Sequence, residues 1–174
     1  LVSKYRDEIL IPKIVIKALN EAISGGYIEI KFFDTILDAT SFIEEELGRA
    51  TNSVKIWDPY VSSRTLRMLE RAISKKLVSI EILSSIPSIV EDIIRLQKRG
   101  FNISIRVIYR KTKTRYESPF HDRYLIIDDN RVWHFGPSIH AAGEKEYESA
   151  ILIPESYGKM IIQAFNYNFE KDKE

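Results

Sequence analysis

The sequence predicts a mixed α/β domain in which helices pack on a mixed β-sheet. Residues 53–109 alternate short apolar segments with helical patterns, in the order strand, helix, strand, helix, strand. This order is typical of parallel strands joined by right-handed crossovers. After residue 109 the pattern turns to strands, and Asp129-Asn130 is a hairpin signal between two of them. The 174 residues are 44% apolar and 29% charged, which suits one globular domain with its own core.

The individual elements follow from apolar periodicity and from the residues that can begin or end them. We expect a helix at 2–24 ended by Gly25-Gly26, a strand at 27–33, and a helix that Asp34 or Thr35 caps and that runs to about residue 49. Then follow a strand at 53–57, a helix opened by Ser62 or Ser63, a strand at 78–83, a helix at 87–98, a strand at 102–109, a polar loop at 110–118, strands at 123–128, 131–135 and 147–153, and a helix at 155–169.

The chain divides into two expected parts, a helical segment at 1–26 and a domain at 27–174. Because the chain starts at Leu1 rather than Met, we expect the first part to link to an upstream domain. The 26 basic and 25 acidic residues nearly balance, so no global charge demands nucleic acid, a membrane or an acidic partner. The absence of cysteine excludes disulfides, thiolate catalysis and zinc–thiolate sites. No signal peptide or bilayer-length apolar run is visible, so we expect a cytoplasmic protein without a transmembrane segment.

A candidate phosphate site lies at the entry to the strand expected at 123–128, where His121 and Arg123 are two residues apart. Such residues share one face of a strand at roughly 7 Å, so a phosphate fits between them. Arginine matches phosphate oxygens with a planar fork, and a neutral imidazole can attack phosphorus or transfer a proton. Asp128 projects to the opposite face of a regular strand and is expected to have a supporting role. An ordinary ion pair for Arg123 and a polar surface position for His121 are the alternatives.

Three further residues are candidates for the same site. Ser138 and His140 lie in a turn and would bind phosphate oxygens, and Glu148 would hold His121 in one tautomer, as a carboxylate does in a nucleophilic triad. Ser138 could instead cap a short helix. Asp58 ends a strand at the carboxyl edge of the sheet, where ligands tend to bind, and a simple turn is the alternative.

A local basic patch precedes these residues. Six basic residues lie in the segment from Arg106 to Arg123, with Tyr109 and Tyr116 interleaved. The patch itself consists of Arg110, Lys111, Lys113 and Arg115. This composition is typical of surfaces that track a nucleic-acid backbone or bind anionic lipid head groups. A solvated loop has the same composition.

The residues from His121 to Asp128 resemble the H-x-K-x-x-x-x-D motif of the phospholipase D superfamily, with Arg123 in the place of Lys. Ser138 and His140 stand where that family carries G-S-x-N, and Glu148 where it carries the His-orienting carboxylate. The H-D-R form also resembles the phospholipase D-like C-terminal domains of proteins with microtubule-interacting-and-trafficking (MIT) domains. Those domains serve as dimeric membrane-binding modules.

The resemblance implies a phospholipase D-like fold and a phosphohistidine mechanism that needs no metal and no cofactor. In that family two such motifs meet at a pseudo-twofold axis, whereas this chain has one. Three functions therefore stay open: a homodimeric phosphodiesterase, with a nuclease favoured by the basic loop; a non-catalytic module that binds anionic lipid, nucleic acid or a protein; and a regulatory domain of a larger protein.

Overall fold

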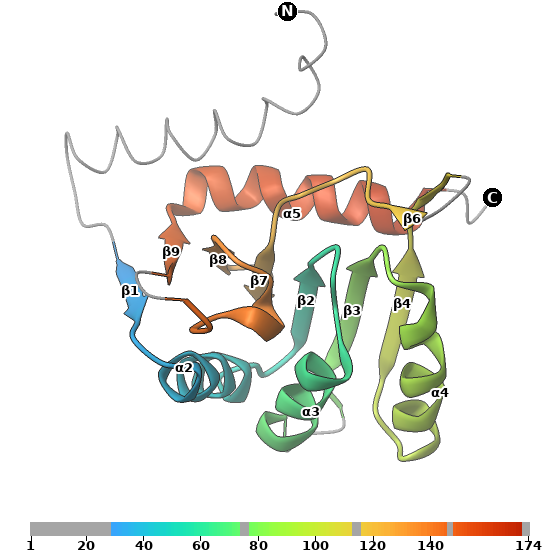
Figure 1. Cartoon of the computed structure of the whole chain (residues 1–174), viewed down its shortest axis with the longest axis horizontal. Coiled ribbons are helices and arrows are strands. Elements are labelled where there is room, and N and C mark those ends of the chain that lie inside the picture. The colour runs from blue at the N-terminus through green and yellow to red at the C-terminus, as the bar shows by residue number, and fades with distance from the viewer. Residues whose placement is uncertain (1–28, 74–76, 113–115, 146–147, 172–174) are drawn as a thin grey trace, which may run out of the picture.

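A computed structural model describes residues 29–73, 77–112, 116–145 and 148–171 of the chain. The helix expected at 2–24 and the boundary between the two expected parts lie outside these residues. Seven strands form one sheet in the order β1-β9-β8-β7-β2-β3-β4 (Figure 1). Strands β2 (Ser53–Trp57), β3 (Ser79–Ser84) and β4 (Ile103–Val107) are parallel, and β7 (Tyr124–Ile127), β8 (Arg131–Phe135), β9 (Glu148–Ile153) and β1 (Ile30–Phe33) add antiparallel neighbours. The expected mixed α/β fold class is therefore confirmed.

Helices cover both faces of the sheet. Figure 1 shows α5 (Glu155–Glu170) on one side and α2 (Ile36–Gly48), α3 (Ser63–Ala72) and α4 (Val90–Lys98) on the other. Alternate residues of β2 serve the two sides: Val54 and Ile56 join the core under α2 and α3, and Trp57 joins the core under α5. None of the helices in the described segments has the length and apolarity that crossing a bilayer requires.

Polar side chains fix where the helices begin. Of the two candidate caps before α2, Thr35 accepts the backbone N–H of Asp38. Ser62 and Thr65 form a reciprocal capping box at the start of α3. Each cap satisfies N–H groups that have no partner inside the helix, which stabilises a helix by about 1 kcal/mol.

Three expected boundaries are corrected by the structure. The segment 110–118, expected as a loop, contains the short strands β5 (Arg110–Lys111) and β6 (Tyr116–Glu117), which pair with each other. Two-residue strands have no periodicity that a sequence pattern could reveal. The helix expected at 87–98 begins as a 3-10 turn at Pro87–Ile89. Strand β7 is shorter than the expected 123–128, because Arg123 and Asp128 lie outside its ladder.

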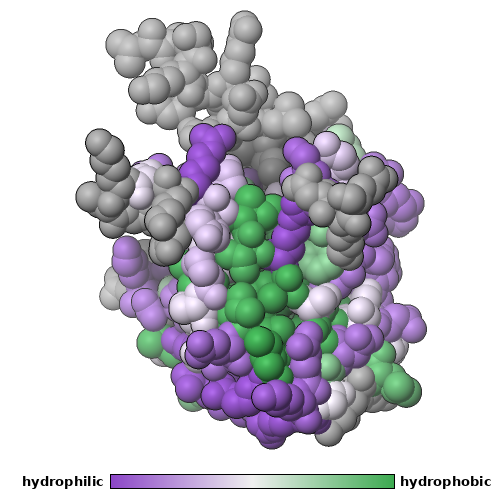
Figure 2. All heavy atoms as spheres, turned by 90° about the vertical axis from the view of Figure 1, so that its right-hand side faces the viewer, coloured by the Kyte–Doolittle hydropathy of each residue, from purple (hydrophilic) through white to green (hydrophobic). Residues whose placement is uncertain are grey.

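An apolar stripe runs down the outer face of the edge strand β4 and α4 (Figure 2). Val90 and Ile94 of α4 are 37% and 44% exposed, so this stripe is not covered within the described part of the chain.

Carboxylates organise the end of the sheet at which β7 finishes. Asp128 adopts a positive φ of 52° and accepts the backbone N–H groups of Thr51, Asn52 and Ser53. Burial opposes ionisation of this carboxylate, but the hydrogen bonds outweigh it and lower the pKa of Asp128 to about 2. Asp128 thus ties the β7–β8 turn to the start of β2.

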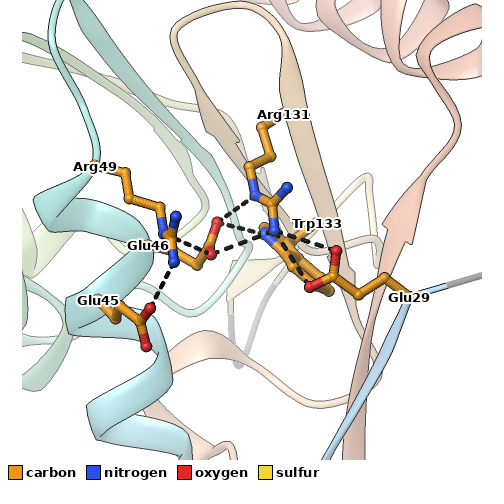
Figure 3. Close-up of polar contacts among 6 residues, drawn as sticks. All are labelled: Glu29, Glu45, Glu46, Arg49, Arg131 and Trp133. Atoms are coloured by element: carbon orange, nitrogen blue, oxygen red, sulfur yellow. Dashed lines mark hydrogen bonds and ion pairs between the residues drawn. The ribbon is translucent and has the colours of Figure 1, made fainter.

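Glu46 is the second carboxylate at this end and is only 2% exposed. It accepts hydrogen bonds from Arg131 Nε and Trp133 Nε1, both at 2.7 Å, and Arg49 approaches it at 3.2 Å (Figure 3). The charge of Glu46 is therefore matched by two guanidinium groups, and α2 is fastened to β8.

Replacing Glu46 with alanine should lower the free energy of unfolding by about 2–4 kcal/mol, because the buried Trp133 Nε1 would lose its acceptor. Arg131 would lose one of its two carboxylate partners and keep the other, Glu29. Urea denaturation measures this loss. The matched control is Glu45→Ala, which removes only an exposed pair with Arg49 and should cost less than about 1 kcal/mol. Equal losses in the two variants would contradict the assignment.

Candidate functional site

Asp58 lies directly after β2, at the carboxyl edge of the sheet, and its side chain is fully buried. Its carboxylate accepts three hydrogen bonds, from Tyr60 N at 2.9 Å, Ser138 Oγ at 3.1 Å and Ile139 N at 2.7 Å. Burial raises the pKa of Asp58, and these hydrogen bonds together with the charge of Arg123 counteract that rise. Asp58 therefore joins the end of β2 to the turn that follows β8.

That turn also receives Arg123. The Arg123 Nη1 donates to the carbonyl oxygen of Gly136 at 3.1 Å, and the Phe135 N–H donates to the carbonyl oxygen of Arg123 at 2.9 Å. Arg123 is thereby held at the turn that carries Ser138, while their shared phosphate site stays a prediction. The Nε of Arg123 is buried and has no hydrogen-bond partner among the described residues. An anion that accepts this hydrogen would satisfy it.

His121 is exposed and precedes the sheet. His121 and Arg123 both lie before the β7 ladder, which begins at Tyr124, so the strand geometry expected for the pair is not formed there. Their joint contact with one phosphate stays a prediction. The approach to β7 is instead anchored by Phe120, whose ring packs edge-on against Trp57 with centroids 5.9 Å apart. His121 thus stands on a short irregular segment between two anchored residues, Phe120 and Arg123.

Asp122 is the residue that the sequence analysis did not assign to the site. Burial raises the pKa of Asp122, while the charges of Arg123 and His121 counteract that rise. Its Oδ1 also lies 4.0 Å from His134 Nε2. Asp122 therefore interacts electrostatically with His121 and Arg123 and lies near the largely buried His134. The β7–β8 register, which pairs Tyr124 with His134, is the signal that could have placed it there.

Glu148 begins β9, and its carboxylate accepts the backbone N–H groups of Gly143 at 2.7 Å and Lys145 at 3.4 Å. The predicted hydrogen bond to His121 does not occur among the contacts of the described residues. Gly143 has a φ of 81°, and a Cβ there would lie 2.2 Å from the carbonyl oxygen of Thr35. Glu148 therefore holds a tight loop against the start of α2, and its role toward His121 stays a prediction.

Ser138 precedes the 3-10 turn η3 (Ile139–Ala141), and His140 lies within it. Ser138 occupies the N-cap position, but its side chain makes no capping bond and donates to Asp58 instead. The Nδ1 of His140 is buried without a hydrogen-bond partner in the described structure. Ser138 is thus near Arg123 through the turn, and the phosphate-binding roles of both residues stay predictions.

The basic patch is only partly described. Arg110 is exposed on β5, whereas the side chain of Lys111 and all of Lys113 and Arg115 fall outside the described residues. Within the described segments, no group of three or more histidine and acidic residues is arranged to hold a metal ion. The chemistry that the site offers is therefore that of a guanidinium, imidazoles, a hydroxyl and buried carboxylates.

Comparisons by sequence give no assignment: no protein-family model matches the chain, and no curated protein is significantly similar to it. Comparisons by structure do. NucT from Helicobacter pylori superposes with a TM-score of 0.59 at 15% identity, covering 82% of this chain and 96% of NucT. Nuc from Salmonella typhimurium, a phospholipase D family member, gives 0.57 at 15% identity with the same coverage.

A third similar structure extends further along the chain. TrmBL2, an archaeal chromatin protein with a novel mode of DNA binding, gives a TM-score of 0.56 at 18% identity. The match covers 97% of this chain but 64% of TrmBL2, so this chain spans about two thirds of that protein. At these identities the likeness shows the fold.

The unfolding free energy should depend on pH through His134. Burial, together with the charge of Arg123, lowers the pKa of His134 to about 4, whereas an unfolded histidine titrates near 6.5. Below about pH 6.5 the unfolded state therefore binds a proton that the folded state does not. The free energy of unfolding should fall by up to about 3 kcal/mol as the pH is lowered from about 6.5 to 4. Denaturation of wild type and His134→Gln at several pH values measures this. An equally steep loss in the variant over that interval would contradict the assignment.

Proposed function

We propose that this chain, whose fold is phospholipase D-like, binds the phosphate group of a phosphodiester at Arg123, with His121 and Ser138 beside it. The observation that carries the proposal is the state of Arg123. Its Nη1 is fixed by the carbonyl of Gly136, while its buried Nε has no partner among the described residues. A guanidinium fixed at one nitrogen presents its other donors in a defined direction, which suits bidentate phosphate binding.

The carboxylates around Arg123 limit how the site can attract an anion. Asp58 and Asp122 both interact electrostatically with Arg123 and therefore offset part of its charge. Binding must then depend on directed hydrogen bonds more than on net charge. This is the behaviour expected of a site that recognises phosphate geometry, because fixed donors act over short distances.

Hydrolysis needs a second acid–base group. In the proposed reaction, the imidazole of His121 attacks phosphorus and displaces an alkoxide, which must be protonated; the phosphohistidine is then hydrolysed by an activated water. His134 is a poor candidate for the second imidazole, because it is largely buried and its pKa is about 4. We therefore propose that a homodimer forms the full site and that His121 of the partner subunit supplies the proton.

A second candidate function is phosphate binding without turnover in a larger DNA-associated protein. It is favoured by the likeness to TrmBL2, which covers 97% of this chain. Arg123 in place of the family's lysine fits this function too. Phosphate binding needs only the two parallel donors of a guanidinium, whereas hydrolysis also needs groups positioned to protonate the leaving alkoxide. The two functions share the same phosphate site and differ in whether a phosphorus–oxygen bond is broken.

The first function predicts that the purified protein hydrolyses bis(p-nitrophenyl) phosphate in the presence of EDTA. The variant His121→Ala should lose at least about a thousandfold in kcat/KM, because the nucleophile is gone. Lys159→Ala, which breaks an exposed pair with Glu155, is the control and should keep full activity.

If no turnover is seen, phosphate binding tests whether the second function holds. Calorimetric titration with inorganic phosphate should show binding, and Arg123→Ala should weaken it at least about tenfold. The control is Arg71→Ala, which removes an ion pair with Glu44 and should leave phosphate binding unchanged. A wild-type protein that binds phosphate at Arg123 but hydrolyses no phosphodiester would support the second function. Phosphate binding that is insensitive to Arg123 would contradict both.

A further inference from the structure

A cavity of about 820 Å³ opens at the carboxyl edge of the sheet, beside the candidate phosphate site. It lies between the start of α3, the turn before α4 and η3, and its volume is in the range of about 300–1,000 Å³ that small-molecule sites occupy. Its lining includes Ser138 and His140, which are candidate residues of the phosphate site. The cavity therefore reaches the turn after β8, to which Asp58 and Arg123 also bind.

The lining of the cavity is rich in hydrogen-bond acceptors and carries negative charge. Glu91 and Asp92 supply two carboxylates, four serines supply hydroxyls, and the lining contains no lysine or arginine. Asp92 forms an ion pair with Arg95 at 2.8 Å and accepts a hydrogen bond from the hydroxyl of Ser63 at 3.0 Å. Glu91 is exposed. A second phosphate or carboxylate on the ligand would be repelled here, while hydroxyl or amine groups would find partners.

Two further side chains offer contacts to an organic group. Tyr60 is 41% exposed at the cavity, so its ring is available to pack against a ligand or to face a cation. His140 has a buried Nδ1 without a hydrogen-bond partner among the described residues. The cavity thus combines an exposed aromatic surface with carboxylates and hydroxyls, and His140 is part of its lining.

We infer that this cavity receives the alcohol part of a phosphate ester, one that carries hydroxyl or amine groups and no second negative charge. The inference rests on the proposed function, because the phosphate would be held at Arg123 while its substituent enters the cavity past Ser138. A nucleic-acid strand fits less well, since its neighbouring phosphates would meet Glu91 and Asp92. The same cavity chemistry would also accept a free amino alcohol, which the experiment below separates.

The test compares four probes by calorimetric titration of the whole chain: inorganic phosphate, O-phosphoethanolamine, O-phosphoserine and ethanolamine. Phosphoethanolamine and phosphoserine differ by one carboxylate. We expect phosphoethanolamine to bind at least about fivefold more tightly than phosphoserine, because the added charge approaches Glu91 and Asp92. Glu91→Gln and, separately, Tyr60→Ala should reduce the advantage of phosphoethanolamine over inorganic phosphate. Glu45→Gln, an exposed glutamate on α2, is the matched control and should leave it unchanged.

The outcomes that overturn the inference are distinct from those that overturn the proposed function. Inorganic phosphate that fails to bind would contradict the proposed function. Phosphate binding with equal affinity for phosphoethanolamine and phosphoserine would overturn the inference alone, as would an advantage that survives Glu91→Gln and Tyr60→Ala. If ethanolamine bound as tightly as phosphoethanolamine, the ligand of the cavity would be a free amino alcohol and the inference of a phosphate ester would be overturned. A single-stranded oligonucleotide that binds more tightly than phosphoethanolamine would overturn it in favour of nucleic acid.

Discussion

The buried carboxylate of Asp58 connects the two parts of the chain from which the candidate site is built. Its three hydrogen bonds reach Tyr60, at the approach to α3, and Ser138 and Ile139, in the turn after β8. A carboxylate with no exposure to solvent is costly unless its oxygens are fully hydrogen-bonded. The geometry of the turn therefore follows from the need to satisfy Asp58, and Arg123 takes its position from that turn through the carbonyl of Gly136.

Carboxylates act differently at the two ends of the sheet. At the end where β7 finishes, Asp128 and Glu46 are matched by backbone N–H groups, arginines and the Trp133 indole, so their charges are compensated locally. At the end with the candidate site, burial raises the pKa values of Asp58 and Asp122. Two candidate site residues at this end, Arg123 and His140, also have a buried polar atom without a hydrogen-bond partner among the described residues, as is common where a fold binds ligands.

The fold was predictable from the sequence because parallel and antiparallel strands differ in their connections, and these are visible as alternating patterns along the chain. The detailed site was less predictable. His121 and Arg123 were expected to follow the geometry of a strand starting at residue 123, whereas the ladder begins at Tyr124. Strand ends depend on ladder partners that no local pattern reveals. The proximity of Asp122 to His134 arises from the β7–β8 register. The carboxylate of Glu148 is used by the loop at Gly143, whose close approach to Thr35 depends on tertiary packing.

The most direct test of this account is the affinity of the folded Asp58→Asn variant for inorganic phosphate, measured by calorimetry beside the wild type. The substitution removes a negative charge near Arg123, so simple electrostatics would strengthen phosphate binding. We expect the opposite, a weakening of about tenfold or more, because an amide cannot accept all three hydrogen bonds that hold the turn. Unchanged or tighter binding by a variant with native circular dichroism would contradict the central role given to Asp58.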